Sequence, residues 1–362
     1  LNEQENIYCE RVFSPMVDME KKLRENSIPL FALETMDPIK NFDFIGFTLQ
    51  YEMSYTNILN ILDLANIPLL SKDRTLEHPF VMAGGPCGYN PEPLADFVDI
   101  VVLGEGEEVL LEILEVYRQW KKQKTSRKDF LHSISNIEGV YIPAFYDVEY
   151  DEEGKIMGFF PISNDYPPKI NKRIIRDLDK SFYPEKMIVP YTSIVHDRIM
   201  VEIFRGCTRG CRFCQAGIVY RPVREKSPDT IREIANKLIQ SSGYEELSLA
   251  SLSTSDYTHL IPLVEKLMED YKDRNIGLSL PSLRIDQFSV KLAEQIQKVR
   301  KSGLTFAPEA GTQRLRDVIN KGVMEEDILR TVGQAFESGW GTIKLYFMIG
   351  LPTETIEDIE GI

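Results

Sequence analysis

Apolar and polar positions in the first 125 residues follow two patterns, one typical of helices and one typical of buried strands. Residues 19–30 and 56–64 place apolar side chains every three or four positions, which predicts amphipathic helices. Short, nearly continuous apolar runs predict buried strands at 29–33, 42–49, 79–83 and 99–103. Strands that alternate with helices and end in glycine-rich turns indicate a doubly wound parallel sheet of the Rossmann type. We therefore assign 1–125 to an incomplete Rossmann-like α/β domain, part of whose sheet we expect to precede residue 1.

A different pattern occupies residues 126–195. Two aromatic-rich runs, 140–146 and 155–160, flank the turn-forming residues 151–154, and this arrangement predicts a β-hairpin. We assign 126–195 to an insert or linker between two domains.

A longer repeat of strand and helix begins at residue 196. Strands are expected at 200–204, 246–250, 276–280, 304–307 and 342–348. Ser227 as N-cap and Pro228 at the first helical position predict a helix after the first of them. Five β/α units in series indicate a partial barrel of the TIM type, with its active site on the loops that follow the strands. We assign 196–362 to this barrel and expect a sixth unit beyond residue 362.

Composition narrows the classes of protein. The 362 residues carry a formal net charge of −14, which argues against non-specific nucleic-acid binding by the whole surface. The sequence contains no apolar run long enough to span a bilayer, so no membrane association is expected. It has five cysteines, no disulfide-like spacing and no secretory signal, which indicates a reducing cytoplasm.

Three of the five cysteines lie within eight residues, at Cys207, Cys211 and Cys214. Three thiolates at this C-x3-C-x2-C spacing suit three irons of a cubane cluster and leave the fourth iron open to a substrate. The motif follows the first strand of the barrel, where such a fold places catalytic groups.

Two other readings of the motif compete with an open cluster. A structural zinc site requires four ligands, and His196 and His259, which precede the first strand and follow the second, do not lie within the same short loop. Inert cysteines that cluster by chance are the second alternative. Gly206 and Gly210 argue against it, because they allow the loop to wrap tightly and present backbone N–H groups to sulfide.

The motif, with Phe213 just before its last cysteine, resembles that of the radical S-adenosylmethionine (SAM) superfamily. The upstream segments resemble the cobalamin-binding domain of the B12-dependent subclass: Gly84-Gly85-Pro86, 90–93, 96–102 and 104–107. As a whole the sequence is most similar to an uncharacterised family of B12-binding-domain radical SAM proteins. This resemblance implies a [4Fe-4S] cluster on Cys207, Cys211 and Cys214, SAM on the open iron, and an external electron donor similar to flavodoxin or ferredoxin.

The resemblance also implies SAM contacts on the later strands. On the second strand, Ser253 and Asp256 stand where the superfamily often has Gly-Gly-Glu, and an ordinary Ser/Thr turn is the alternative. On the third strand, Arg284 is expected to bind the SAM carboxylate, against an ion pair with Asp286. After the fourth strand, Glu309 is expected to accept hydrogen bonds from the ribose or amine.

Two further contacts follow from the same resemblance. Arg314 is expected near the SAM carboxylate, and Ile349, after the fifth strand, is expected to pack on adenine. Core packing is the alternative for Ile349.

For cobalamin, Gly84, Gly85 and Gly104 are expected to allow close backbone approach. The D-x-H-x-x-G motif of many B12 domains is absent from the sequence, and a Rossmann-like domain without ligand is the alternative. Cys9 and Cys87 are too few to hold the second cluster of radical SAM methylthiotransferases.

Basic residues crowd the cysteine motif: Arg198, Arg205, Arg209, Arg212, Arg221, Arg224 and Lys226. They could tune the potential of the cluster, hold the carboxylate of SAM or receive a phosphate-bearing substrate such as RNA, and a solvated face is the alternative. The function expected from the sequence is reductive cleavage of SAM, with cobalamin-dependent methylation of a substrate. The alternative is a non-catalytic iron–sulfur or zinc protein that acts by binding a partner.

Overall fold

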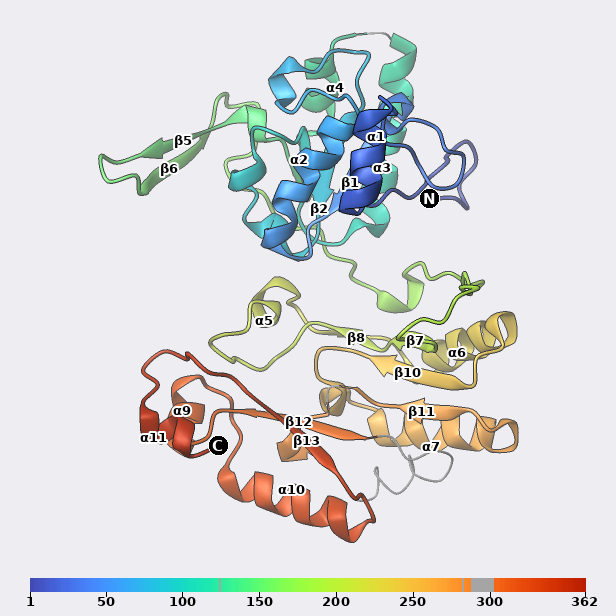
Figure 1. Ribbon diagram of the computed structural model, residues 1–362, viewed down its shortest axis with the longest axis vertical. Helices are drawn as coiled ribbons and strands as arrows, with labels where there is room; N and C mark the ends of the chain where they lie inside the picture. Colours follow the sequence, from blue (N-terminus) through green and yellow to red (C-terminus); the bar gives the residue numbers. More distant parts are fainter. Residues whose placement is uncertain (124, 282, 288–302) are drawn as a thin grey trace. The chain divides into compact units, whose positions relative to one another are not determined.

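The computed structural model describes residues 1–123, 125–281, 283–287 and 303–362 of the chain (Figure 1). The chain divides into two compact units, Leu1–Ile175 and Arg176–Ile362, which we call unit 1 and unit 2 and describe separately.

Unit 1 is built on a four-stranded sheet with the order β1-β2-β3-β4. Its strands are β1 (Phe44–Thr48), β2 (Phe80–Gly84), β3 (Ile100–Val102) and β4 (Val140–Tyr141). The first three are parallel, and β4 pairs antiparallel with β3. Its helices are α1 (Val17–Glu25), α2 (Tyr55–Leu64), α3 (Gly106–Gln123) and α4 (Arg127–Ile134).

Burial explains why these segments form the sheet. Phe80, Val81, Met82 and Ala83 of β2 are all buried, as are the three residues of β3, which is typical of parallel strands covered on both faces. Aromatic rings join β1 and β2 to α3 and α4, with ring centroids 4.6 Å apart for Phe80 and Phe130. The expected Rossmann-like α/β sheet is confirmed.

One expectation for unit 1 needs correction. Residues 29–33 form no strand; Phe31 makes only an isolated bridge to Pro38. Within the segment 126–195, which we predicted to be an insert or linker, Phe130 and Ile134 of α4 lie in the core of unit 1, and β4 joins its sheet.

The expected hairpin is present, formed by β5 (Tyr146–Tyr150) and β6 (Ile156–Pro161). In its turn, Asp151 Oδ1 accepts hydrogen bonds from the amides of Glu153 (2.9 Å) and Lys155 (2.7 Å). Figure 1 shows the hairpin extending away from the helices of unit 1.

Unit 2 contains the five expected strands. They are β7 (Ile199–Glu202), β10 (Glu246–Ala250), β11 (Gly277–Ser279), β12 (Leu304–Glu309) and β13 (Ile343–Phe347). The first three form a parallel sheet with the order β11-β10-β7, and β12 pairs parallel with β13. A short antiparallel pair, β8 (Phe204–Arg205) and β9 (Arg224–Glu225), follows β7.

The helices of unit 2 lie between these strands, except for the last, which follows β13. They are α5 (Ala216–Val219), α6 (Pro228–Ser242), α7 (Leu260–Tyr271), α9 (Gln313–Val318), α10 (Glu325–Glu337) and α11 (Ile356–Glu360). The Ser227 hydroxyl accepts from the amide of Thr230 at 3.3 Å, so the predicted N-cap is confirmed. The helix expected between the third and fourth strands falls on 288–302, outside the described residues.

The loops that follow the parallel strands of unit 2 determine where a site can form. In each parallel group the carboxyl ends of the strands lead to the same edge, so residues after β7, β10 and β11 share one edge, as do residues after β12 and β13. In the part of the chain that the structure describes, no helix has both the length and the apolar character needed to cross a bilayer.

Candidate active site

The cysteine loop, residues 206–215, starts at a glycine that no other residue replaces without strain. Gly206 has a φ of +90°, and an added Cβ would lie 2.8 Å from the carbonyl oxygens of Tyr220 and Pro222. Only glycine meets both conditions, because a side chain disfavours positive φ and would collide with the backbone. The chain therefore turns sharply out of β8 into the loop.

The three cysteines of this loop carry free thiols that are partly exposed. The amide of Cys214 donates to the carbonyl of Cys211 at 3.1 Å, which folds the second half of the motif into a turn. Within the described residues, no three Cys, His, Asp or Glu side chains are arranged to hold a metal ion as they stand. The donor set, three thiols on one loop, fits an iron–sulfur cluster.

The end of α9 holds one side of the cysteine loop. The amide of Arg212 donates to the carbonyl of Ile319 at 2.9 Å, and Asn320 Nδ2 donates to the carbonyl of Gly210 at 2.8 Å. A Cβ added to Gly210 would lie 3.0 Å from that same amide nitrogen. The loop is thus packed against the segment that follows the fourth barrel strand.

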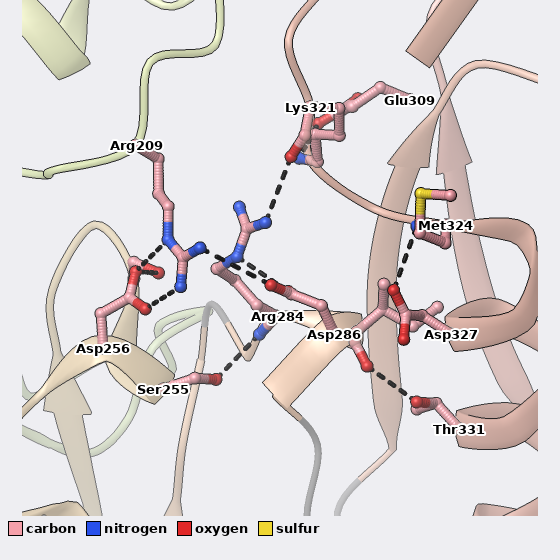
Figure 2. Close-up of polar contacts among 12 residues, drawn as sticks. Arg209, Ser255, Asp256, Arg284, Asp286, Glu309, Lys321, Met324, Asp327 and Thr331 are labelled. Atoms are coloured by element: carbon pink, nitrogen blue, oxygen red, sulfur yellow. Dashed lines mark hydrogen bonds and ion pairs between the residues drawn. The ribbon is translucent and has the colours of Figure 1, made fainter. Parts of the chain in front are cut away.

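Arg209 ties the other side of the loop to the ends of β10 and β11 (Figure 2). Its Nε lies 3.0 Å from Asp256 Oδ2, and its Nη2 bonds Oδ1 of the same carboxylate. Asp286 lies beyond, with Oδ2 at 3.7 Å from Arg209 Nη1. The Ser253 hydroxyl also donates to Asp256, at 2.7 Å.

These contacts determine the charge of Asp256. Burial raises the pKa of its carboxyl, but the hydrogen bonds from Arg209 and Ser253 outweigh burial and leave the pKa below its ordinary value. Asp256 is therefore an anion at neutral pH.

Arg284 lies in the same group of charges. Its amide donates to the Ser255 hydroxyl at 2.9 Å, its Nε donates to Asp286 Oδ1 at 2.9 Å, and its Nη2 reaches the carbonyl of Lys321 at 3.2 Å. The side chains of Arg284 and Asp286 are 11% and 15% exposed, so this pair is largely desolvated. Figure 2 shows Arg284 directed toward the segment that carries Lys321.

Glu309 closes the group at the end of β12. Its carboxylate pairs with Lys321 Nζ at 3.0 Å, and its carbonyl accepts from the amide of Met348, just after β13. Its backbone has a φ of +72°, a conformation that non-glycine residues adopt at a cost and that often marks functional sites. Lys321 Nζ also lies 6.0 Å from the ring centroid of Phe213, in the cysteine loop.

Two expected site residues lie outside this group. Arg314 bonds Asp358 of α11 and the carbonyl of Thr353 (2.9 Å), and the Asp358 pKa is held below its usual range by the bond from Arg314. Ile349 is 74% exposed in the turn after β13 and is not a core residue.

Some of the basic residues around the motif pair with carboxylates. Arg198 bonds Glu246 of β10 at 2.6 Å, and Arg205 bonds Glu202, three residues before it, at 2.9 Å. Lys226 is buried and donates to Ser181 at 2.9 Å. The positive charge seen in the sequence is thus neutralised in part.

Three glycines of unit 1 lie at the carboxyl edge of its sheet: Gly84 is the last residue of β2, Gly85 follows it, and Gly104 comes two residues after β3. Gly104 has a φ of +104°, and an added Cβ would lie 2.1 Å from the carbonyl oxygen of Arg173. The close approach of the Arg173 backbone is therefore enough to explain why residue 104 is a glycine. Gly85, with a φ of +113°, lies close to the backbone of Leu49.

Lys321 and Asn320 were not found by sequence reasoning. They follow α9 in a turn where Asn320 and Gly322 both have positive φ, and only the composition of that turn, Asn-Lys-Gly, signals it. Their contacts with Glu309 and with the cysteine loop come from segments distant in sequence.

Two family models match the chain. "Radical SAM proteins, N-terminal" matches residues 1–143, and "Radical SAM superfamily" matches residues 201–362. An uncharacterised protein of Methanocaldococcus jannaschii, MJ0966, is 32% identical over 94% of this chain and 66% of its own length.

Solved structures share the fold. The cobalamin-dependent SAM radical enzyme OxsB, with aqua-cobalamin and SAM bound, matches 96% of this chain and 45% of its own, with a TM-score of 0.59 and 14% identity. The radical SAM methyltransferase TsrM from Kitasatospora setae, with cobalamin and a [4Fe-4S] cluster, matches 95% and 63%, with a TM-score of 0.57 and 14% identity.

The chain therefore spans less than two thirds of the length of each of these three proteins. The two family models together cover most of its residues, and the cysteine motif lies within the second. The chain belongs to the radical SAM superfamily of enzymes, whose members use a [4Fe-4S] cluster and SAM.

Proposed function

We propose that this chain binds a [4Fe-4S] cluster through Cys207, Cys211 and Cys214, cleaves SAM reductively on it, and uses cobalamin in unit 1 to methylate a substrate. One observation carries the proposal. The loop that bears the three thiols is bonded on one side to Asp256 after β10 and on the other to Asn320 after α9, so it lies beside the charged groups at the strand ends.

The charged groups suit the two ends of an amino acid. The methionyl part of SAM carries a carboxylate and an amine, and Arg284 and Lys321 offer cations while Asp256 and Glu309 offer anions. Glu309 and Lys321 now pair with each other, so an incoming zwitterion can exchange that one ion pair for two of its own without leaving either side chain unpaired.

Held by Cys207, Cys211 and Cys214, the cluster would supply one electron for reductive cleavage of SAM; the adenosyl radical so formed would take a hydrogen atom from the substrate, and methylcobalamin would supply the methyl group that replaces it. The electron comes from an external donor similar to flavodoxin or ferredoxin. In this chain, Gly206 and the contacts of Arg209 and Asn320 fix the course of the cysteine loop. Glu309 and Lys321 orient the methionyl part of SAM.

Support for cobalamin comes from unit 1 and from the likeness to OxsB and TsrM, both described as structures with cobalamin bound. Gly84 and Gly85 lie at the edge of the parallel sheet where such folds bind ligands. Titration with hydroxocobalamin, followed by its visible spectrum after removal of unbound ligand, tests this part. Cobalamin that is completely lost on gel filtration would contradict it.

Anaerobic reconstitution with iron and sulfide, followed by SAM and dithionite, tests the activity. The account expects 5′-deoxyadenosine, and it expects none from a Cys207→Ala, Cys211→Ala, Cys214→Ala variant. Cys9→Ala, which removes an exposed thiol of unit 1, is the matched control and should behave as wild type. A chain that takes up zinc, or a cluster that yields no 5′-deoxyadenosine, would favour the non-catalytic alternative. RNA is tested as a substrate in the same assay, where a true acceptor raises product formation.

A further inference from the structure

Arg209 lies between Cys207 and Cys211 in the sequence, and its side chain is directed toward Asp256 and Asp286, at the ends of β10 and β11 (Figure 2). It makes two hydrogen bonds to one carboxylate, that of Asp256, and lies 3.7 Å from a second, that of Asp286. A paired arrangement of this kind fixes the direction of the guanidinium as well as its distance. Arg209 therefore connects the cysteine loop to two other strand ends of unit 2.

Both carboxylates are themselves held in place. Asp256 accepts a hydrogen bond from the Ser253 hydroxyl at 2.7 Å, and Asp286 accepts one from Arg284 at 2.9 Å. Arg284 is fixed in turn by the bond of its amide to Ser255. Arg209 thus binds carboxylates whose positions are already fixed, so few further side-chain rotations have to be frozen to make the contact.

The pair is shielded from water more than an ordinary surface ion pair. The side chains of Arg209 and Asp256 are 30% and 15% exposed. The charge of Arg209 is carried two residues from Cys207 and two from Cys211 along the chain, in surroundings where screening by solvent is reduced.

We propose that Arg209 is a positioning residue that anchors the cysteine loop to the ends of β10 and β11 and, through its charge, sets the reduction potential of the cluster that the loop holds. This inference rests on the proposed function, because it concerns the same loop. Its geometric part applies to the loop before any cluster is bound. Its electrostatic part follows because a nearby cation favours the more negatively charged, reduced state of a cluster.

A second ion pair of unit 2 provides a matched control. Arg232 of α6 bonds Asp270 of α7 through Nε at 2.9 Å and Nη2 at 2.8 Å, with side chains 29% and 20% exposed. It has the same residue types as the Arg209 pair and a similar exposure, but it joins two helices and lies outside the cysteine loop. Any effect of Arg209→Gln that Arg232→Gln shares is a general cost of losing an ion pair.

The first measurement is the rate at which iodoacetamide alkylates Cys207, Cys211 and Cys214 in the full chain before reconstitution, read by mass spectrometry at a pH high enough that these thiols are ionised in wild type and variants alike. Arg209→Gln should raise these rates several-fold, Arg232→Gln should leave them unchanged, and Arg209→Lys should lie between. Asp256→Asn should act like Arg209→Gln, and the double variant should be no worse than either alone, because both changes break one contact.

The second measurement separates charge from position. After anaerobic reconstitution, an EPR-monitored redox titration should give Arg209→Gln a more negative midpoint potential than wild type, while Arg209→Lys, which keeps the charge, stays near wild type.

Equal alkylation rates and equal potentials for Arg209→Gln and Arg232→Gln would overturn the inference. If Arg209→Gln does not fold, judged by circular dichroism, Arg209→Lys decides through the alkylation rates, and rates equal to wild type reject the anchor. A wild-type chain that takes up no [4Fe-4S] cluster defeats the proposed function alone, because the alkylation comparison still tests the anchor.

Discussion

Glu309 and Lys321 form an ion pair of 3.0 Å in which the acid sits on a left-handed backbone at φ +72°. The side chains are 15% and 13% exposed, so water screens the pair weakly. Lys321 also lies over the ring of Phe213, which connects the pair to the cysteine loop. An acid held in a costly conformation beside the candidate cluster is a feature that function explains better than stability does.

Glu309→Gln should weaken SAM binding to the reconstituted protein. A hydrogen bond to a charged group contributes about 1.5–3 kcal/mol, so the Kd should rise at least about tenfold. Equilibrium dialysis under anaerobic conditions measures it. Glu269→Gln is the control, because it breaks the exposed pair of Glu269 with Lys266 on α7 and should leave the Kd unchanged. An unchanged Kd for Glu309→Gln would remove Glu309 from the SAM site.

Glu309→Gly and Glu309→Ala should differ in stability although both lose the ion pair. Glycine adopts positive φ freely, whereas alanine does not, so the glycine variant should be more stable by about 1 kcal/mol. Urea unfolding of the two variants measures the difference directly. Equal stabilities would mean that the backbone at this position relaxes and stores no strain.

Gly104→Ala should destabilise unit 1 whether or not cobalamin binds. The new Cβ would lie 2.1 Å from the Arg173 carbonyl oxygen, on a backbone with φ +104°. Gly154→Ala is the control, with φ +79° in the hairpin turn and no atom within 4 Å, so it carries only the conformational cost. We expect roughly 1–3 kcal/mol for Gly154→Ala and clearly more for Gly104→Ala, by thermal unfolding. Equal losses, with cobalamin binding abolished only in Gly104→Ala, would instead assign Gly104 to the ligand.

Acid should weaken unit 2 through Asp256. The pKa of Asp256 is lower in the folded chain than its unfolded value of about 3.9, so its contribution to stability is fully present above that pH and is lost as the pH falls through the folded pKa. Below pH of about 4, the free energy of unfolding of wild type should fall with pH more steeply than that of Asp256→Asn, by up to about 1.4 kcal/mol per pH unit. Urea unfolding of the cluster-free chain at several pH values gives both slopes, and parallel slopes would contradict the assignment.

The strands and capped helices of this fold were readable from the sequence because their signals are local. The apolar run of β10 and the Ser227-Pro228 start of α6 each need only neighbouring residues to be recognised. The run at 29–33 misled because an apolar segment also packs as an irregular chain, and here Leu30 is buried without a ladder of strand partners. Val140 and Tyr141 pair with the edge of β3 in the sheet of unit 1. No local sequence pattern predicts this pairing.

The site also has a part that local sequence predicts and a part that it does not. The cysteine motif is local, and its position after the first barrel strand followed from the order of elements. Which arginine meets which carboxylate is not local: Arg314 bonds Asp358, 44 residues away in sequence, whereas Arg209 finds Asp256, 47 residues away. The basic run around the motif suggested a positive patch because its partners lie on other strands.

The central claim is that the cluster on Cys207, Cys211 and Cys214 keeps one iron open for SAM. EPR spectroscopy of the reduced, reconstituted protein, recorded with and without saturating SAM, tests this most directly. The account predicts a [4Fe-4S] signal whose shape changes when SAM is added, in wild type and in Cys9→Ala, and no such signal in Cys207→Ala. A four-iron signal that saturating SAM leaves unaltered would contradict it.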